Sequence, residues 1–182
     1  MKGDVTMIYT SDTIEKEAVF EVAKLMAAAA RTAPKAKGVD NILTLVLDGA
    51  EKSAVADEMR RVSEQENLIF LKRDASNVDD SDYVVAIAVK DNPAGLTFCR
   101  TCGFDNCAEA VKAGVPCAFN ISDLGTAACS ACAVASHHWI DNRLMYTIGR
   151  AVKNLNLFGT EIRMCYGIPV SAKGKSIYYD RK

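Results

Sequence analysis

The run Tyr83-Val-Val-Ala-Ile-Ala-Val89 is the clearest strand pattern in this chain. A short apolar run of this kind is typical of a buried β-strand. It leads directly into a loop that carries four cysteines. The predicted sheet and the candidate site therefore meet where this strand ends.

The pattern on either side of this strand predicts an alternation of helices and strands. Asn41-Ile-Leu-Thr-Leu-Val-Leu47 is another short apolar run and predicts a second buried strand. Apolar residues at helical spacing predict helices over residues 13–32, 50–67, 105–113, 123–136 and 141–155, and a last strand covers 161–170. Residues 68–71 fit a short helix or a strand, residues 77–82 a polar loop, and residues 116–120 an extended segment. Ser122 or Asp123 is the expected cap of the 123–136 helix.

These elements predict one α+β domain over residues 1–182, with a cysteine-rich segment, residues 96–120, inserted into it. The chain shows no internal repeat, no low-complexity stretch and no linker. A length of 182 residues is enough for one domain with a sizeable core.

The inserted segment contains Cys99, Cys102, Cys107 and Cys117, spaced C-x2-C-x4-C-x9-C. A [4Fe–4S] cluster needs four thiolates, and a compact loop can supply three of them while a later residue supplies the fourth. Gly103 follows the second cysteine, where the backbone must turn tightly. A four-cysteine zinc site also favours C-x-x-C-G turns and stays open as an alternative. The spacing therefore favours an iron–sulfur cluster over zinc, and both over a disulfide.

Three cysteines lie outside this spacing: Cys129, Cys132 and Cys165. Cys129 and Cys132 form a second C-x-x-C, but they lie in a run of small residues with helical pattern, and cysteine often serves as a small buried hydrophobe. Cys165 lies in an apolar strand pattern. We expect all three to contribute to packing rather than to metal binding.

Composition excludes several classes of function. The formal net charge is −1, which gives no electrostatic reason to expect nucleic acid or an anionic membrane as a partner. No apolar run approaches the roughly 18 residues of a membrane span, and the first ten residues lack the apolar core of a signal peptide. We therefore expect a cytoplasmic protein. Seven cysteines in such a chain indicate metal or redox chemistry.

Two weaker motifs do not support further sites. Gly174-Lys-Ser176 resembles the end of a phosphate-binding P-loop, but Pro169 stands where the first glycine belongs, and the chain is too short afterwards for the required helix. His137 and His138 are adjacent, so on a helix they do not share a face. A position in a helix C-terminal turn explains the histidines better than a metal site does.

Four longer motifs identify a family resemblance. They are residues 30–42 (Ala-Arg-Thr-Ala-Pro-Lys-Ala-Lys-Gly-Val-Asp-Asn-Ile), Cys102-Gly-Phe-x-x-Cys107, Asp141-Asn-Arg-Leu-Met145 and Gly167-Ile-Pro-Val-Ser-Ala-x-Gly-Lys175. Together they resemble the uncharacterised ferredoxin-domain proteins of anaerobic bacteria and archaea, across nearly the whole chain. The name of that family implies a [4Fe–4S] cluster, which would use Cys99, Cys102, Cys107 and Cys117 here.

A more distant resemblance is to the nitroreductase-like flavoproteins. Their helix that ends in an Ala-Pro turn resembles the one ending at Ala33-Pro34, and their Gly-x-Pro strand end resembles Gly167-Ile-Pro169. This resemblance implies a central mixed or antiparallel sheet flanked by helices, a homodimer, and FMN at the dimer interface. The residues it would place near FMN are Arg31, Thr32, Lys35, Lys173 and Arg181. The arginine–serine phosphate motif of that family is absent before the first helix, and Gly38 stands where the family has Asn.

The sequence therefore predicts a cytosolic iron–sulfur protein that transfers electrons, alone or together with a bound flavin as an oxidoreductase. Its expected partners are a second copy and a redox protein or small molecule that donates or accepts electrons. No catalytic residue can be assigned. The alternative is a non-catalytic structural or binding protein whose four-cysteine site holds zinc or a structural cluster.

Overall fold

The computed structural model describes residues 8–179. Its centre is a four-stranded sheet in the order β1-β2-β4-β3, formed by β1 (Ile42–Leu47), β2 (Tyr83–Val89), β4 (Met164–Ser171) and β3 (Asp141–Asn142). Every neighbouring pair of strands is antiparallel. Of the two arrangements expected for the sheet, mixed or antiparallel, the antiparallel one is therefore present.

The two faces of β2 explain why its sequence is apolar without interruption. Tyr83, Val85, Ile87 and Val89 belong to one hydrophobic cluster and Val84, Ala86 and Ala88 to another. Because alternate residues of a strand point to opposite faces of the sheet, a strand covered on both sides needs apolar residues at every position. All seven residues of β2 are buried, as the sequence predicts.

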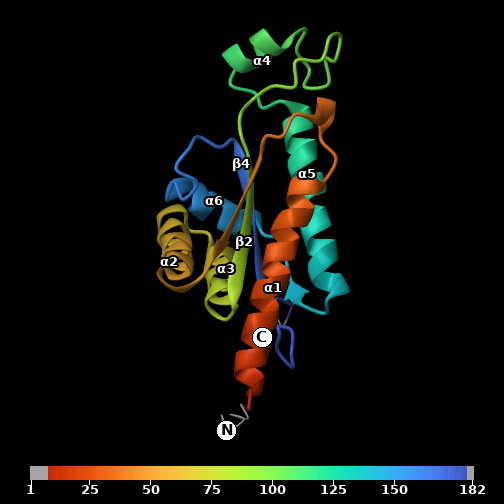
Figure 1. Cartoon of the computed structure of the whole chain (residues 1–182). Coiled ribbons are helices and arrows are strands. Elements are labelled where there is room, and N and C mark those ends of the chain that lie inside the picture. Colours follow the sequence, from red (N-terminus) through yellow and green to blue (C-terminus); the bar gives the residue numbers. More distant parts are fainter. Residues whose placement is uncertain (1–7, 180–182) are drawn as a thin grey trace.

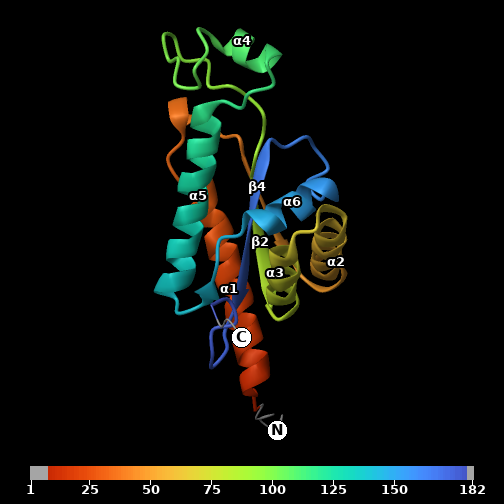
Figure 2. The same ribbon diagram turned by 180° about the vertical axis from the view of Figure 1, so that it is seen from behind.

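Helices cover both faces of the sheet (Figures 1 and 2). On one face, α1 (Ser11–Thr32) packs along α5 (Ala118–His137), and on the other lie α2 (Gly49–Glu66), α3 (Ile69–Asp79) and α6 (Tyr146–Asn154). The buried residues of α1 follow helical spacing: Val19, Val22, Ala23, Met26 and Ala30. The helix ends before Pro34, as expected.

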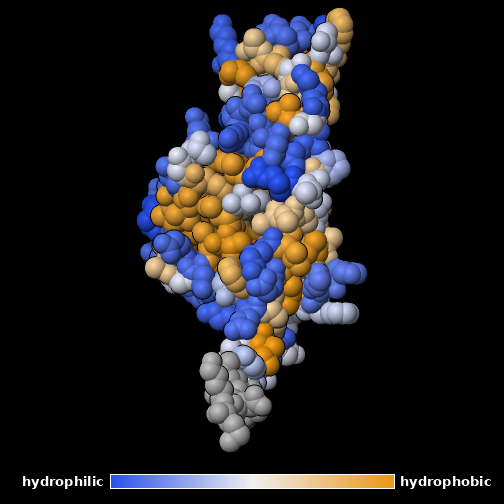
Figure 3. All heavy atoms as spheres, viewed as in Figure 1, coloured by the Kyte–Doolittle hydropathy of each residue, from blue (hydrophilic) through white to orange (hydrophobic). Residues whose placement is uncertain are grey.

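The edge strand β1 lies between these two layers of helices. It contains no charged residue, and its four central residues are only partly buried. In the view of Figure 1, apolar side chains gather over the middle of the molecule, and polar side chains predominate above them (Figure 3).

No helix formed by residues 8–179 has the length and apolar character that a membrane crossing requires.

The expected extended segment at 116–120 is wrong beyond Cys117, because α5 already begins at Ala118. The expected cap, Asp123, instead accepts hydrogen bonds from the backbone N–H of Ala36, at 3.1 Å to each carboxylate oxygen. This tertiary contact binds the turn after α1 to α5. Because α5 begins at Ala118, Asp123 lies inside the helix and does not cap it.

The expected helix over 141–155 is also partly wrong. Asp141 and Asn142 pair with Ser171 and Val170 as strand β3, and α6 begins only at Tyr146. The open edge of β4 offers ladder hydrogen bonds that local sequence pattern cannot reveal. In contrast, residues 68–71, which fit either structure, belong mainly to helix α3, and that helix takes up much of the expected polar loop at 77–82.

Candidate metal centre

The cysteine segment, residues 90–117, leaves the sheet at the end of β2 and returns at the start of α5. It contains one short helix, α4 (Cys107–Lys112), and irregular loops before and after it. Figure 1 shows α4 and these loops beyond one end of the sheet, next to the beginning of α5. The segment is therefore an addition to the α+β body rather than a part of its core.

All four predicted ligands line one hollow in this segment. Cys99, Cys102, Cys107 and Cys117 share it. Most of the other lining residues are apolar: Pro93, Leu96, Phe104, Ala110, Val115 and Ala118. The structure thus brings together thiols that lie up to 18 positions apart in the sequence, in largely apolar surroundings.

The four thiols surround this hollow without converging on a single point. Among residues 8–179, no three His, Cys, Asp or Glu side chains lie close enough together to hold one metal ion. Tetrahedral zinc at about 2.3 Å from each sulfur would require such convergence. In a [4Fe–4S] cluster each thiolate binds a different iron, so the sulfurs belong farther apart.

Backbone conformation in the segment is unusual near Cys99 and Cys102. Phe98 and Arg100 have left-handed φ values of 57° and 48°, and Gly103 has a φ of 87°. Residues other than glycine rarely adopt this conformation, because it is strained. Alternation between right- and left-handed residues turns successive N–H groups toward one side and forms anion-binding concavities, which are found at many Fe–S sites. Gly103 provides the tight turn expected after Cys102, with its N–H donating to Arg100 O at 3.0 Å.

The start of α5 faces the same site. Cys117 occupies the N-cap position of this 20-residue helix. The unpaired N–H groups and the dipole at a helix N-terminus favour negative charge nearby. A cluster with four thiolate ligands carries net negative charge, so its proposed fourth ligand stands at a favourable place in the fold.

The pKa values of three thiols distinguish Cys99 from Cys132 and Cys165. A hydrogen bond with the Thr101 hydroxyl, and then one from its backbone N–H, lowers the pKa of Cys99. Burial raises the pKa of Cys132 to about 11 and that of Cys165 to about 12. Metals bind the thiolate, so a raised pKa disfavours Cys132 and Cys165 as ligands.

The remaining cysteines confirm the packing prediction in part. Cys165 is buried in the cluster between the sheet and α6, and Cys132 packs partly buried against the α1–α5 layer. Cys129 is exposed, so the prediction that it packs inside is wrong for the isolated chain. Its helical position places it on the outer side of α5, whereas Ala128 and Ala131 face inward. His137 and His138 are also exposed, at the end of α5, with ring centroids 5.6 Å apart.

Polar contacts at the base of the segment were not predicted from the sequence. Asn120, 2% exposed, donates from Nδ2 to the carbonyls of Lys90 and Asn92, at 3.2 and 2.8 Å. Asn41 and Asn92 exchange further amide hydrogen bonds. Arg163 contacts both Asp91 and Gly114. Single polar residues spread over the whole chain give no local signal that they meet at one place.

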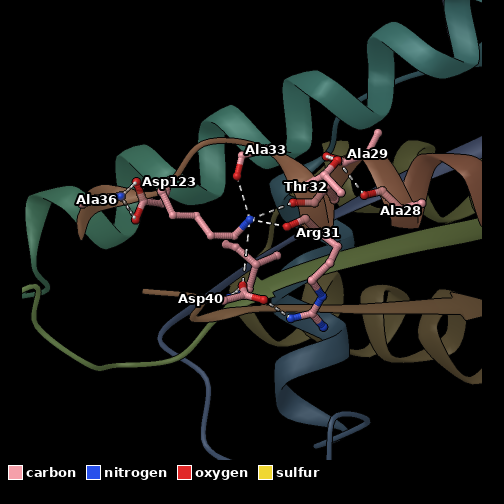
Figure 4. A network of polar contacts seen from close by, with 11 residues as sticks. Ala28, Ala29, Arg31, Thr32, Ala33, Ala36, Asp40 and Asp123 are labelled. Atoms are coloured by element: carbon pink, nitrogen blue, oxygen red, sulfur yellow. Dashed lines mark hydrogen bonds and ion pairs between the residues drawn. The ribbon is translucent and has the colours of Figure 1, made fainter. Parts of the chain in front are cut away.

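The residues proposed for FMN near the end of α1 are engaged within the chain (Figure 4). Arg31 forms an ion pair with Asp40. The ammonium of Lys35, whose side chain is 6% exposed, donates to the carbonyls of Arg31 and Ala33 at 2.5 and 2.8 Å. The Thr32 hydroxyl donates to Ala28 O at 3.1 Å. The side chains of Lys35 and Thr32 thus satisfy carbonyls at the C-terminal end of α1, whereas Arg31 pairs with a carboxylate.

The other FMN candidates are not near this end of α1. Lys173 lies beside Asp12 and Lys16, at the start of the helix, and a helix rises about 1.5 Å per residue, so about 28 Å separate Asp12 from Arg31 along it. Arg181 lies outside the described residues. Within one chain, Lys173 therefore lies far from Arg31, Thr32 and Lys35.

Comparison with known proteins identifies a relative that covers nearly the whole chain. A protein from Archaeoglobus fulgidus, described as an uncharacterized protein, is 39% identical over 184 residues, covering 96% of this chain and 98% of its own length. The family described as "Uncharacterized protein containing a ferredoxin domain (DUF2148)" matches residues 113–181. The chain belongs to this family. The ferredoxin-domain resemblance seen in the sequence is thereby confirmed.

Solved structures show that this ferredoxin-domain protein has the nitroreductase-like fold. YcnD of Bacillus subtilis, a hypothetical oxidoreductase, matches with a TM-score of 0.57 at 12% identity, over 86% of this chain and 58% of its own. The nitroreductase CinD of Lactococcus lactis, in complex with nicotinic acid, gives 0.56 at 13% identity, over 92% and 81%. NfrA1 of B. megaterium gives 0.54 at 11% identity, over 90% and 61%. The chain thus spans about three-fifths of the length of NfrA1, and at these identities the likeness establishes the fold alone.

Proposed function

We propose that this ferredoxin-domain protein binds a [4Fe–4S] cluster through Cys99, Cys102, Cys107 and Cys117, and that it transfers electrons. One observation supports this most directly: the four thiols of the predicted spacing line a single hollow. The other three cysteines lie on α5 and β4. The four proposed ligands are thus separated from the other three cysteines in space as well as in sequence.

The residues around the hollow fit such a group. The bound cluster would supply one-electron transfer. The thiolates would hold it, left-handed residues of the kind found at many Fe–S sites lie next to Cys99 and Cys102, and most of the other residues that line the hollow are apolar. Hydrogen bonds to sulfur and solvent exposure are the factors by which a protein sets the reduction potential of a cluster.

Partners and cofactors beyond the cluster stay predictions. A redox protein or a small molecule has to exchange electrons with the site, and the family resemblance suggests a homodimer. If a flavin is bound between two copies, the protein would be an oxidoreductase that couples one-electron to two-electron steps. If the site holds zinc, it would be a structural or binding protein.

Anaerobic purification with metal and flavin analysis of one sample tests the proposal. We expect about four irons per chain and a broad absorption band near roughly 400 nm. One zinc per chain in a colourless sample would contradict the proposal, and flavin peaks would extend it.

Two cysteine variants test the ligand assignment. Cys102→Ala should lose the cluster, because three thiolates hold it poorly. Cys132→Ala, a matched thiol whose side chain packs against the α1–α5 layer, should keep its iron. Iron retained in Cys102→Ala, or lost in Cys132→Ala, would show that the ligands are other thiols.

A further inference from the structure

Arg163 lies at the base of the cysteine segment, immediately before β4. Its backbone N–H donates to the carbonyl of Val89, the last residue of β2, at 2.8 Å. Its position is therefore fixed by the central strands of the sheet. The side chain is 31% exposed and extends toward the segment.

The guanidinium of Arg163 contacts both ends of the segment. Its Nη2 donates to Gly114 O at 2.5 Å, three residues before Cys117, and its Nη1 lies 3.5 Å from Asp91 Oδ2, two residues after β2. Asp91 is more than one-third exposed, so that ion pair contributes little. The charge-assisted hydrogen bond to the Gly114 carbonyl is the stronger contact.

We propose that Arg163 is a positioning residue that holds Cys117 in place relative to Cys99, Cys102 and Cys107. This inference rests on the proposed function. The first three thiols follow the outgoing end of the segment and the fourth precedes its return. A cluster needs all four sulfurs at once. The two ends of the cysteine segment therefore have to keep a fixed position relative to each other. Arg163, which is attached to the sheet, fixes that position through its contacts with Asp91 and Gly114.

The chain offers informative variants. Arg163→Gln removes the charge and the fork of donors. Arg163→Lys keeps the charge but, as a point donor, does not reach both partners in the same geometry. Arg150→Gln is a matched control, because Arg150 forms a comparable ion pair, 3.8 Å from Glu66, on the helical body.

The first measurement is hydrogen exchange of the metal-free proteins. We expect residues 90–117 to exchange about tenfold faster in both Arg163 variants, which corresponds to about 1.4 kcal/mol, while the sheet is unchanged. The second measurement, on anaerobically loaded protein, is iron content and reduction potential. Both Arg163 variants should hold less iron and show a shifted potential, and Arg150→Gln should match the wild type.

Two results would overturn the inference. Wild-type exchange and iron content in both Arg163 variants would show that the contacts position nothing. A potential shifted in Arg163→Gln but normal in Arg163→Lys, with unchanged exchange, would show that only charge acts. If Arg163→Gln does not fold, the lysine variant decides alone. A wild-type protein without iron would contradict the proposed function, whereas exchange in the metal-free proteins would still show whether Arg163 fixes the segment.

Discussion

The buried side-chain amide of Asn120, on the first turn of α5, donates a hydrogen bond of 2.8 Å to the carbonyl of Asn92, at the start of the cysteine segment. The two residues are 28 positions apart, and the four cysteines lie between them. A single amide thus joins the outgoing and returning ends of the candidate site.

Asn120→Ala should weaken the attachment of the segment. The substitution leaves the carbonyls of Lys90 and Asn92 without this donor, and a buried polar group that loses its partner costs about 1–3 kcal/mol. Urea unfolding should show a loss of this size, and residues 90–117 should exchange faster. Thr126→Ala, at an exposed hydroxyl of the same helix, is the control and should leave both measurements unchanged.

Gly149→Ala should destabilise the α6 side of the body. A Cβ at this position would lie 1.7 Å from the backbone oxygen of Cys165, so α6 would have to move away from β4. Forced overpacking of a core typically costs about 1–3 kcal/mol, and here backbone, not a flexible side chain, is in the way. Thermal unfolding checks this. Gly125→Ala, where a Cβ has open space, should be neutral or stabilising.

Lys35→Met should reduce stability even in flavin-free protein. The ammonium of Lys35 donates to carbonyls at the end of α1, and these would lose a charged donor. We expect a loss of about 1.5–3 kcal/mol, the usual value of hydrogen bonds to charged groups. Lys37→Met, at an exposed residue of the same turn, is the comparison. Unchanged stability of Lys35→Met would show that this amine is available for another ligand.

Glu58 should make stability depend on acid pH. Hydrogen bonds from Arg61, at 2.6 and 2.7 Å, and one from Asn154 lower the pKa of this carboxyl in the folded protein. A group with a lowered folded pKa stabilises above its unfolded pKa, near 4.5 here, and loses that stability as the pH falls through the folded value. Urea midpoints of Glu58→Gln should therefore fall less below pH 4.5 than those of the wild type. Glu64→Gln, at an exposed ion pair, should follow the wild-type profile.

Thiol alkylation of the metal-free protein should distinguish Cys99 from Cys132 and Cys165 by their reaction rates. At pH 8, Cys99, with its lowered pKa, should react with iodoacetamide much faster than Cys132 and Cys165, whose pKa values are about 11 and about 12. Raising the pH toward 11 should accelerate the reaction of Cys132, because its thiolate fraction rises. Mass spectrometry of the labelled peptides gives the order. Equal rates for Cys99, Cys132 and Cys165 at pH 8 would contradict this prediction.

The strands and long helices could be predicted because their sequence signals are local. β2 has an unbroken apolar run and α1 has apolar residues at helical spacing before a proline, and both were predicted closely. The starts of α5 and α6 were not, because Asp123 and Asp141 form contacts with segments far away in the chain. The residue pattern around a helix start does not reveal contacts with segments far away in the chain.

The family resemblance, the α+β class and the four-cysteine spacing could be recognised without the structure, since each rests on residue patterns that are short and local. The folded chain was needed to show that the four thiols line one hollow, that Arg31 and Lys35 contact groups of their own chain, and that Asn120 and Arg163 form hydrogen bonds at the base of the site. The physical reason is that a hydrogen bond or an ion pair depends on the final distance between two groups. That distance is set when the whole sheet and its helices pack together.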